Sequence, residues 1–433
     1  MAQELIHINV RNIVVRVLLI AMLICAGAGS YFAARWYIGN TLAEYFNASE
    51  NNLDTARMAV SMAPSDPLTH WRIAQVSQKL LPLDRQGEAV KEYEQAVQLS
   101  PHDYRLWVSL GRAYEQAGDP VKAENSLRRA VALAPSYAYP HWYLGNLLLR
   151  NARYDEAFEE IRMASDADAD LRAQQFNLIW AIYSNDSEGL KNAVGDRPDA
   201  RASFALYLLN QKRFEVGLGL WNSISSEEKN ANRHTGELIV TTLRNEHRFH
   251  DAARVWNDIA GDKYRAEIGQ IFDGSFEHLS SYGESIFGWQ VKGVPHMQVG
   301  IDPNKSYGGA RSLRMRFQAR TNLDEFNVSQ LIAVQPQTEY EFSCYVSTDK
   351  LQTGSAPQIE IVDAAAGTQY VATPQAPNGT HDWNHLTYTF KTGEKTEAIF
   401  LKVVRVSCST KETPVCPIFG SVWYDDFSIK RRN

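Results

Sequence analysis

Residues 107–114 read Trp107-Val-Ser-Leu110-Gly111-Arg-Ala-Tyr114, and part of this stretch recurs one period later as Leu144-Gly145. Small residues keep the same interval of 34 positions in two series, Ala89, Ala123, Ala157 and Ala96, Ala130, Ala164. Self-similarity at this period is typical of stacked helix pairs. The small residues let two helices approach closely, and the large ones fill the space between pairs. The middle of the chain is therefore predicted to be an all-α solenoid.

The pattern W-x2-L-G-x2-Y at 107–114, followed by Ala123 and Pro135, resembles the tetratricopeptide repeat. The resemblance implies a concave groove, lined by the first helix of each pair, that binds a protein partner. By family position the groove carries Trp71, Gln75, Lys79, Arg105, Arg112, Trp142, Asn146 and Arg150. Arginines beside tryptophans would hold an acidic or C-terminal carboxylate segment. The alternative is a solvated helix face whose tryptophans pack against neighbouring helices.

The repeats become looser toward both ends of the array. Two downstream segments share one pattern at a spacing of 35, Phe214-x2-Gly217-x3-Trp221-x2-Ile224 and Phe249-x2-Ala252-x3-Trp256-x2-Ile259. Degenerate terminal repeats are expected in solenoids. We expect about six helix pairs over residues 35–265.

Before the repeats, residues 17–34 contain no charged side chain. With Arg16 reaching to the interface, residues 13–34 are long enough for a transmembrane helix. Arg11 and Arg16 predict a cytoplasmic tail at 1–12 and a periplasmic position for the bulk of the chain, anchored by a single pass in the inner or plasma membrane. The alternative is a signal peptide cleaved near Ala26-Gly27-Ala28, which would give a secreted protein.

After residue 269 the hydrophobic period changes from 3.6 to 2. Apolar and polar residues alternate at 311–317, 339–346 and 385–390, and further runs follow at 358–362, 398–406 and 422–429. Eight or so strands over residues 270–433 predict an all-β sandwich or jelly roll.

Several short motifs in this region follow one another in a recognisable order: Phe272-Asp-Gly-Ser-Phe-Glu277, Gly288-Trp289, Gly309-Ala-Arg-Ser-Leu-Arg314, Trp383, and Trp423-Tyr-Asp-Asp-Phe-Ser-Ile429. The series resembles the galactose-binding-like jelly roll of carbohydrate-binding modules of families four and nine. The resemblance implies that Trp289, Trp383 and Trp423 pack the core. The aromatic residues left for stacking on a sugar are Tyr282, Phe287, Tyr307, Phe326 and Tyr370.

The same resemblance implies a structural calcium ion joining the first and last strands. Glu277 and Asp425 match the acidic positions, with Asp273 or Asp426 as a helper. Carboxylate oxygens suit Ca²⁺, although they also cap turns. Separately, Cys408 and Cys416 bracket a short loop, and an oxidising compartment favours a disulfide between them.

Composition and missing motifs bound the function. A net charge of -6 argues against nucleic-acid binding. No P-loop, H-E-x-x-H, G-x-S-x-G or Cys-x2-Cys motif occurs in the sequence. The sequence thus predicts a non-enzymatic, membrane-anchored scaffold of the cell envelope that binds a protein partner through the solenoid and is positioned at polysaccharide through the jelly roll. An accessory subunit of a glycan-processing enzyme and a structural adhesion or spacer protein remain alternatives.

Overall fold

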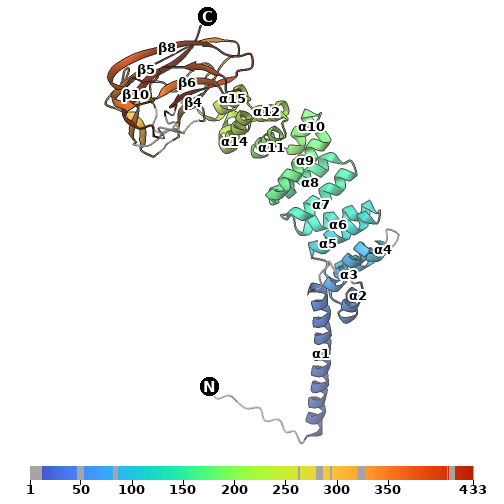
Figure 1. Cartoon of the computed structure of the whole chain (residues 1–433). Coiled ribbons are helices and arrows are strands. Elements are labelled where there is room, and N and C mark those ends of the chain that lie inside the picture. Colours follow the sequence, from blue (N-terminus) through green and yellow to red (C-terminus); the bar gives the residue numbers. More distant parts are fainter. Residues whose placement is uncertain are drawn as a thin grey trace. The chain divides into compact units, whose positions relative to one another are not determined.

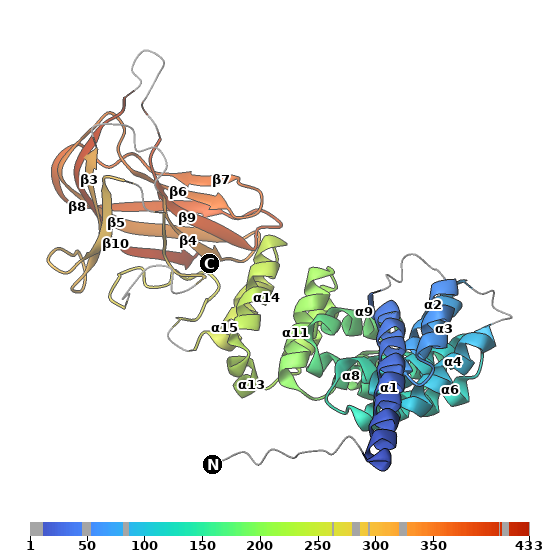
Figure 2. The same ribbon diagram turned by 90° about the horizontal axis from the view of Figure 1, so that it is seen from below.

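The structure, a computed structural model, describes residues 12–45, 53–80, 86–261, 264–278, 286–292, 295–319, 327–406, 408 and 415–432. The chain forms two compact units, Met1–Gly195 and Asp196–Asn433, which are described separately (Figures 1 and 2).

The first unit is helical throughout its described residues. Its helices pair as neighbours in the order α1 with α2, α3 with α4, α5 with α6, α7 with α8, and α9 with α10. Their bounds are α1 Ile13–Tyr45, α2 Leu53–Met62, α3 Pro67–Leu80, α4 Gln86–Leu99, α5 Tyr104–Gln116, α6 Pro120–Leu133, α7 Ala138–Arg150, α8 Tyr154–Ala167, the 3₁₀ turn η3 Ala169–Leu171, α9 Arg172–Tyr183 and α10 Ser187–Val194.

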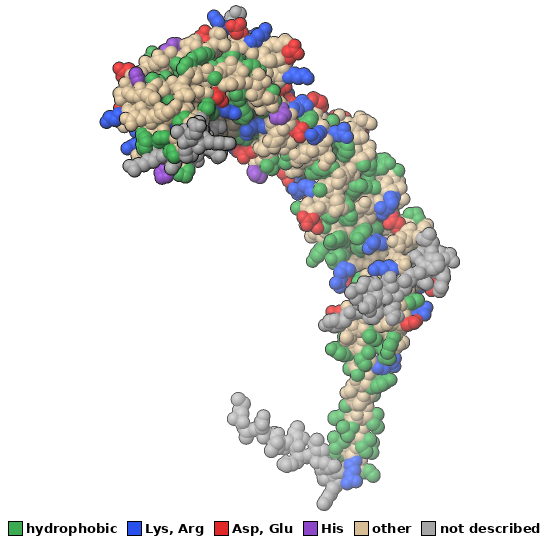
Figure 3. All heavy atoms as spheres, in the orientation of Figure 1, with side chains coloured by type: hydrophobic (Ala, Val, Ile, Leu, Met, Phe, Trp, Pro, Cys, Tyr) green, Lys and Arg blue, Asp and Glu red, His purple; other side chains and the backbone are tan. Residues whose placement is uncertain are grey.

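Helix α1 does not end where its apolar stretch ends. Among the described helices it alone is long and apolar enough to cross a membrane, a test that a signal sequence also passes. Hydrophobic side chains cover much of its surface in the view of Figure 3. The helix continues without a break past Ala34, and its last turns pack on α2 and α3, where Ala43 is fully buried. The C-terminal third of α1 is therefore the first helix of the first pair.

Glycines set the distance between paired helices. A Cβ at Gly111 of α5 would lie 2.7 Å from Leu127 of α6, and one at Gly145 of α7 would lie 2.6 Å from Ile161 of α8. These separations are below van der Waals contact, so only glycine permits this packing. This is the physical reason for the Leu-Gly dipeptide of the repeat.

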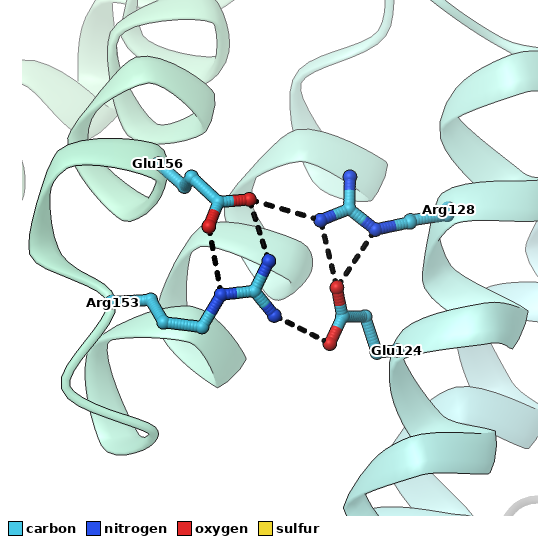
Figure 4. A network of polar contacts seen from close by, with 4 residues as sticks. All are labelled: Glu124, Arg128, Arg153 and Glu156. Carbon is cyan, nitrogen blue, oxygen red and sulfur yellow. Dashed lines mark hydrogen bonds and ion pairs between the residues drawn. The ribbon is translucent and has the colours of Figure 1, made fainter.

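A network of four charged side chains joins consecutive repeats on the second helices (Figure 4). Arg153, in the turn before α8, donates to Glu156 at 2.6 Å and to Glu124 of α6 at 2.8 Å. Arg128 of α6 donates to Glu124 at 2.8 Å and to Glu156 at 3.2 Å. The Arg153 guanidinium lowers the pKa of Glu156. All four side chains are partly exposed, so the network fixes register between repeats more than it adds stability.

The second unit begins with more helices and ends in a sandwich. The helices are α11 Pro198–Asn210, α12 Phe214–Asn222, α13 Ser226–Ala231, α14 Arg233–Asn245 and α15 Phe249–Ile259. The repeated tryptophans expected in this region, Trp221 and Trp256, are fully buried between helices.

Helix α15 is bonded directly to the sandwich. The His250 backbone N–H donates to the Glu397 carboxylate at 3.1 Å, and the His250 ring contacts the Val334 carbonyl through Nε2 at 2.8 Å. The last helix pair and the sandwich therefore belong to one unit.

Ten antiparallel strands make two five-stranded sheets in the described part of the sandwich, ordered β1-β4-β9-β6-β7 and β2-β3-β10-β5-β8. Each of the six runs expected from alternation falls on a strand. The bounds are β1 Gln290–Lys292, β2 Met297–Asp302, β3 Ser312–Ala319, β4 Asn327–Ala333, β5 Glu339–Thr353, β6 Gln358–Asp363, β7 Gln369–Ala372, β8 Gly379–Lys391, β9 Ala398–Val404 and β10 Ile418–Arg431.

The inward-facing residues of both sheets form one core. Between Glu339 and Val346 of β5 the buried residues are Tyr340, Phe342, Cys344 and Val346, and the residues between them face outward. Trp289 lies in this core, as the family resemblance implied. The core fixes which side chains the second sheet presents on its outer face.

Candidate functional site

A polar pocket of about 290 Å³ lies on the first helices of the solenoid, where α3 meets α5. Of the eight predicted groove residues it brings together three, Gln75, Lys79 and Arg112. Its described lining is completed by Gln78, Tyr93, Ser109 and Gln116. Two cations and no carboxylate belong to this set. Burial raises the pKa of Tyr93 to about 12, so its hydroxyl stays protonated and donates to Gln78.

A second pocket of about 490 Å³ adjoins the first and contains two more predicted groove residues, Trp71 and Arg105. The Trp71 indole N–H donates to Ser109 at 3.1 Å, which ties the two pockets together. Arg105 donates two side-chain hydrogen bonds to Asp103, at 2.9 and 2.6 Å. These bonds lower the pKa of Asp103.

The arginines are less available than the sequence suggested. Besides the pairing of Arg105 with Asp103, Arg150 donates to Glu115 at 2.6 Å. The Arg112 guanidinium lies 4.7 Å from the centre of the Tyr143 ring, and this contact leaves its charge uncompensated. Lys79 and Arg112 thus carry the net charge of the polar pocket.

Trp142, Asn146 and Arg150 lie outside both pockets. Trp142 packs against a small cluster that includes Ala138 and Leu171, and Asn146 donates to the Trp142 carbonyl at 2.8 Å. For these two residues the helix-packing alternative describes the contacts better.

An aromatic platform lies on the outer face of the second sheet of the sandwich. It consists of Tyr307, Tyr345, Trp383 and His385. Tyr307 stacks on Tyr345 with ring centres 3.4 Å apart, and Trp383 meets Tyr307 edge-on at 6.3 Å. His385, the cross-strand partner of Tyr345, stacks on its ring at 4.6 Å. Tyr307 is 49% exposed, so the platform is open to solvent.

A cation and a buried tryptophan support the platform from the side. The Lys305 ammonium lies 4.1 Å from the centre of the Trp423 ring and 5.8 Å from that of Trp383. The Trp423 indole donates to Asp302 at 2.9 Å. Trp383 is half-buried on the outer face of the sheet. Trp423 is 8% exposed, but it lies outside the sandwich core, to which its chain neighbours Val422 and Tyr424 belong. The core position predicted for these two tryptophans is therefore wrong.

Two carboxylates hold the loop that carries Tyr307. Asp425, fully buried on β10, accepts from the backbone N–H groups of Tyr307 at 2.7 Å and Gly308 at 3.2 Å. Glu277 accepts from those of Ala310 at 2.8 Å and Arg311 at 3.0 Å. Burial raises the pKa of Asp425, and the amide hydrogen bonds oppose that rise. Asp425 and Glu277, two of the residues predicted to bind calcium, therefore hold the loop that carries Tyr307 of the platform.

The carboxylates predicted to bind calcium are engaged by backbone amides. Asp273 accepts from the backbone N–H of His278, so all three carboxylates are bonded to amides. No group of three acidic, His or Cys side chains suited to a metal ion occurs in the described part of the chain. Calcium stays a prediction, which thermal melts with and without a chelator would test.

Most other sugar-stacking candidates are not at the platform. Phe287 is 3% exposed, so the prediction is wrong for this residue. Tyr370 packs on Phe390 and its hydroxyl bonds Thr396, which leaves the ring unsuited to a ligand. Tyr282 and Phe326 lie outside the described residues. Tyr345 and His385 were missed, although alternation along β5 and β8 places both on outward positions.

The structure pairs Cys408 with Cys416, with Cα atoms 5.3 Å apart. A side-chain N–H of the buried Arg405 donates to the Cys416 carbonyl at 2.8 Å. Cys344 is a buried free thiol, and burial raises its pKa.

Comparison with known proteins identifies both parts of the chain. A family described as "Carbohydrate binding domain" matches residues 269–406, and one described as "Tetratricopeptide repeat" matches residues 104–137. The chain thus contains a tetratricopeptide repeat and a carbohydrate-binding domain. Both domain types are non-catalytic, and tetratricopeptide repeats are protein-interaction modules.

Curated relatives match this repeat protein over short stretches. "Cellulose synthase operon protein C" of Escherichia coli (strain K12) is 35% identical over 103 residues, 23% of this chain and 9% of the relative. "Interferon-induced protein with tetratricopeptide repeats 2" of Cricetulus griseus is 25% identical over 114 residues, 26% of this chain and 24% of the relative. The matches thus span a quarter or less of these relatives' own lengths.

Solved structures match the carbohydrate-binding domain along nearly their whole length. One titled "CBM4 structure and function" is 14% identical and is 99% covered, over 37% of this chain, with a TM-score of 0.28. The CBM22-1 xylan-binding domain from Paenibacillus barcinonensis Xyn10C is 20% identical and is 97% covered, over 38% of this chain, with a TM-score of 0.25.

Proposed function

We propose that this protein is a non-enzymatic scaffold, anchored in the inner membrane of a cell envelope, that holds a protein partner on its solenoid and polysaccharide on its sandwich. The observation that carries the proposal is the aromatic platform of Tyr307, Tyr345, Trp383 and His385. Its setting in polysaccharide assembly or export is supported by the partial likeness to a cellulose synthase operon protein.

The platform has the features that a sugar-binding surface needs. The C–H face of a pyranose packs on an aromatic ring, and nearby polar groups bind its hydroxyls. Tyr307 offers an exposed ring, and the neighbouring Tyr307 hydroxyl raises the pKa of Tyr345, with desolvation adding to the rise. The Tyr345 hydroxyl therefore remains a donor at neutral pH.

The polar pocket supports a partner of defined chemistry for the solenoid. Lys79 and Arg112 supply positive charge and hydrogen-bond donors, and three glutamine amides lie beside them. This set suits a carboxylate, which is negatively charged and accepts hydrogen bonds. An acidic or C-terminal segment of the partner satisfies this requirement.

Retention of α1 as an anchor supplies the physical advantage of the scaffold. Two modules on one anchored chain raise the local concentration of their ligands without any new contact. The continuation of α1 into the first helix pair supports retention, because the same helix belongs to both the span and the solenoid.

Affinity electrophoresis of the full chain in detergent, run through gels that contain individual polysaccharides, tests the proposal. We expect at least one polysaccharide to retard the chain and Tyr307→Ala to abolish the retardation. Tyr139→Ala, which removes a similarly exposed ring from the solenoid, is the matched control. No retardation of the wild type on a broad panel would favour the adhesion or spacer alternative. Equal retardation of both variants would mean that polysaccharide binds elsewhere than on the platform.

A further inference from the structure

We infer that the first helix pair of the solenoid rests on the bilayer surface, with the turn between α2 and α3 in the phospholipid headgroup layer. The inference rests on the proposed membrane anchor and goes beyond it, because an anchored domain can equally hang on a linker away from the lipid. Three sets of contacts argue for direct seating.

The first set marks where the hydrocarbon ends along α1. The uncharged stretch closes at Ala34, and aromatic side chains flank that point, with Tyr31 60%, Phe32 65%, Trp36 51% and Tyr37 67% exposed. Trp and Tyr concentrate where hydrocarbon meets headgroups. The Arg35 guanidinium lies 5.9 Å from the centre of the Tyr31 ring, at the level of lipid phosphates.

The second set shows that the solenoid begins at this same level. Arg35 donates to the Ser61 carbonyl at 2.7 Å, near the C-terminal end of α2. A Cβ on Gly39 would lie 2.7 Å from that of Ala63, so α1 and α2 are in backbone contact there. Since a helix rises about 1.5 Å per residue, Gly39 stands only about 8 Å beyond Ala34.

The third set makes the arrangement rigid. Asn40 donates to Asp66 at 2.9 Å, and Arg72 of α3 donates to the Ala43 carbonyl at 2.7 Å. Because α1 is unbroken from the apolar stretch to these contacts, no flexible linker separates the span from the first pair. The headgroup layer is about 5–8 Å thick on each side of the hydrocarbon, so it reaches the α2–α3 turn.

The occupant of this surface is a phospholipid bilayer. The residues that face it at the turn are Pro64 and Ser65, which are exposed, while Asp66 is buried against Asn40. Arg35 supplies the cation for lipid phosphate. Asp54, at the other end of α2, lies about 10 Å farther from the bilayer than Ser61 along the helix axis.

Depth-dependent fluorescence quenching tests the seating on the full chain in nanodiscs. In a Cys25→Ser background, single cysteines replace Tyr37, Ser65 or Asp54 and carry an environment-sensitive dye; Cys344 is buried and the other two cysteines are paired. With a nitroxide on the lipid headgroup, we expect the labels at 37 and 65 to be quenched about twofold more than the label at 54.

Two outcomes separate this inference from the proposed function. Quenching at 37 with equal, weak quenching at 65 and 54 would keep the anchor and overturn the seating. Loss of quenching at 37, with an N-terminus near Gly29, would overturn the anchor itself. As a second variant, a four-residue Gly-Ser insertion after Tyr37 should abolish the quenching at 65 but not at 37.

Discussion

The imidazole of His70 on α3 faces the carboxylate of Glu92 on α4, with Nδ1 and Oε2 2.7 Å apart. Its other nitrogen contacts the Pro64 carbonyl at 2.9 Å. His141 repeats this arrangement with Glu160 at 2.6 Å and Pro135 at 2.9 Å. Neither a carbonyl nor a carboxylate donates a proton, so both ring nitrogens of His70 donate when both bonds form.

The His70 pair predicts a pH-dependent stability of the solenoid. The hydrogen bond to Glu92 raises the pKa of His70, the Pro64 carbonyl and the Asp66 carboxylate act in the same direction, and burial opposes them. A raised folded-state pKa stabilises the fold fully below the unfolded value of about 6.5, and the contribution is lost as pH rises through the folded value. We expect thermal melts to show a stability loss of about 1 kcal/mol across that window. Glu92→Gln should remove the pH dependence, whereas Glu159→Gln, on an exposed position of α8, should retain it; identical profiles for both variants would contradict the assignment.

Replacement of glycine by alanine is expected to change stability in opposite directions at two sites, one inside a helix contact and one outside it. Gly145→Ala places a methyl 2.6 Å from Ile161, and we expect a loss of about 1–3 kcal/mol in free energy of unfolding. Gly219→Ala on α12 meets nothing within 4 Å and should stabilise by about 0.5–1 kcal/mol, because alanine costs less backbone entropy in a helix. Urea titration of each full-length variant measures both. A stable Gly145→Ala protein would show that the helices can move apart.

Glu277 is predicted to act as a positioning residue for the platform. Glu277→Ala releases the Ala310 and Arg311 amides and should weaken polysaccharide binding about tenfold through disorder of Tyr307, if one charged hydrogen bond of about 1.5 kcal/mol is lost. Glu277→Gln retains an acceptor and should restore part of the affinity. Glu394→Ala, an exposed acid of the same domain, serves as control. An unchanged affinity for Glu277→Ala would mean that the loop keeps its form without this carboxylate.

The bridge between Cys408 and Cys416 should stabilise the sandwich. Its loop is short, so the entropic contribution is about 2–3 kcal/mol. The double change Cys408→Ser with Cys416→Ser is expected to lower the melting temperature of the sandwich transition, and reductant should have no further effect. Cys25→Ser, on α1, should leave the transition unchanged.

The helical part was predictable because its signal is local and periodic. The spacing of Ala123 and Ala157 reports directly on helix contacts, and the Leu-Gly dipeptides report on close approach. The continuation of α1 beyond Ala34 was not predictable, because an apolar stretch indicates which residues can lie in the hydrocarbon and not where the helix ends.

The sites were harder to predict because they depend on contacts distant in sequence. His70, Trp107 and His141 occupy one repeat position, and each ring contacts the proline carbonyl six residues before it. The residue types alone do not show that these three positions are equivalent. Likewise, Tyr345 joins Tyr307 only through the register of β5 with β8 and β10 and the amides bound by Asp425. The ion pairs of Arg105 with Asp103 and of Arg150 with Glu115 were not foreseen, and the second depends on two residues that are 35 positions apart in the sequence.

The bonds from His250 to Val334 and Glu397 bear on how fragments of this protein should be cut. Similarity alone marks a module at 269–406, yet strand β10, which lies between β3 and β5, begins at Ile418. A fragment ending at 406 would lack the central strand of one sheet, and one beginning at 270 would lose the bonds from α15 to Val334, just after β4, and Glu397, just before β9. The unit of this chain that can be transferred as a whole is Asp196–Asn433. A domain exchange that preserves the fold must therefore transfer the helices of this unit together with its strands.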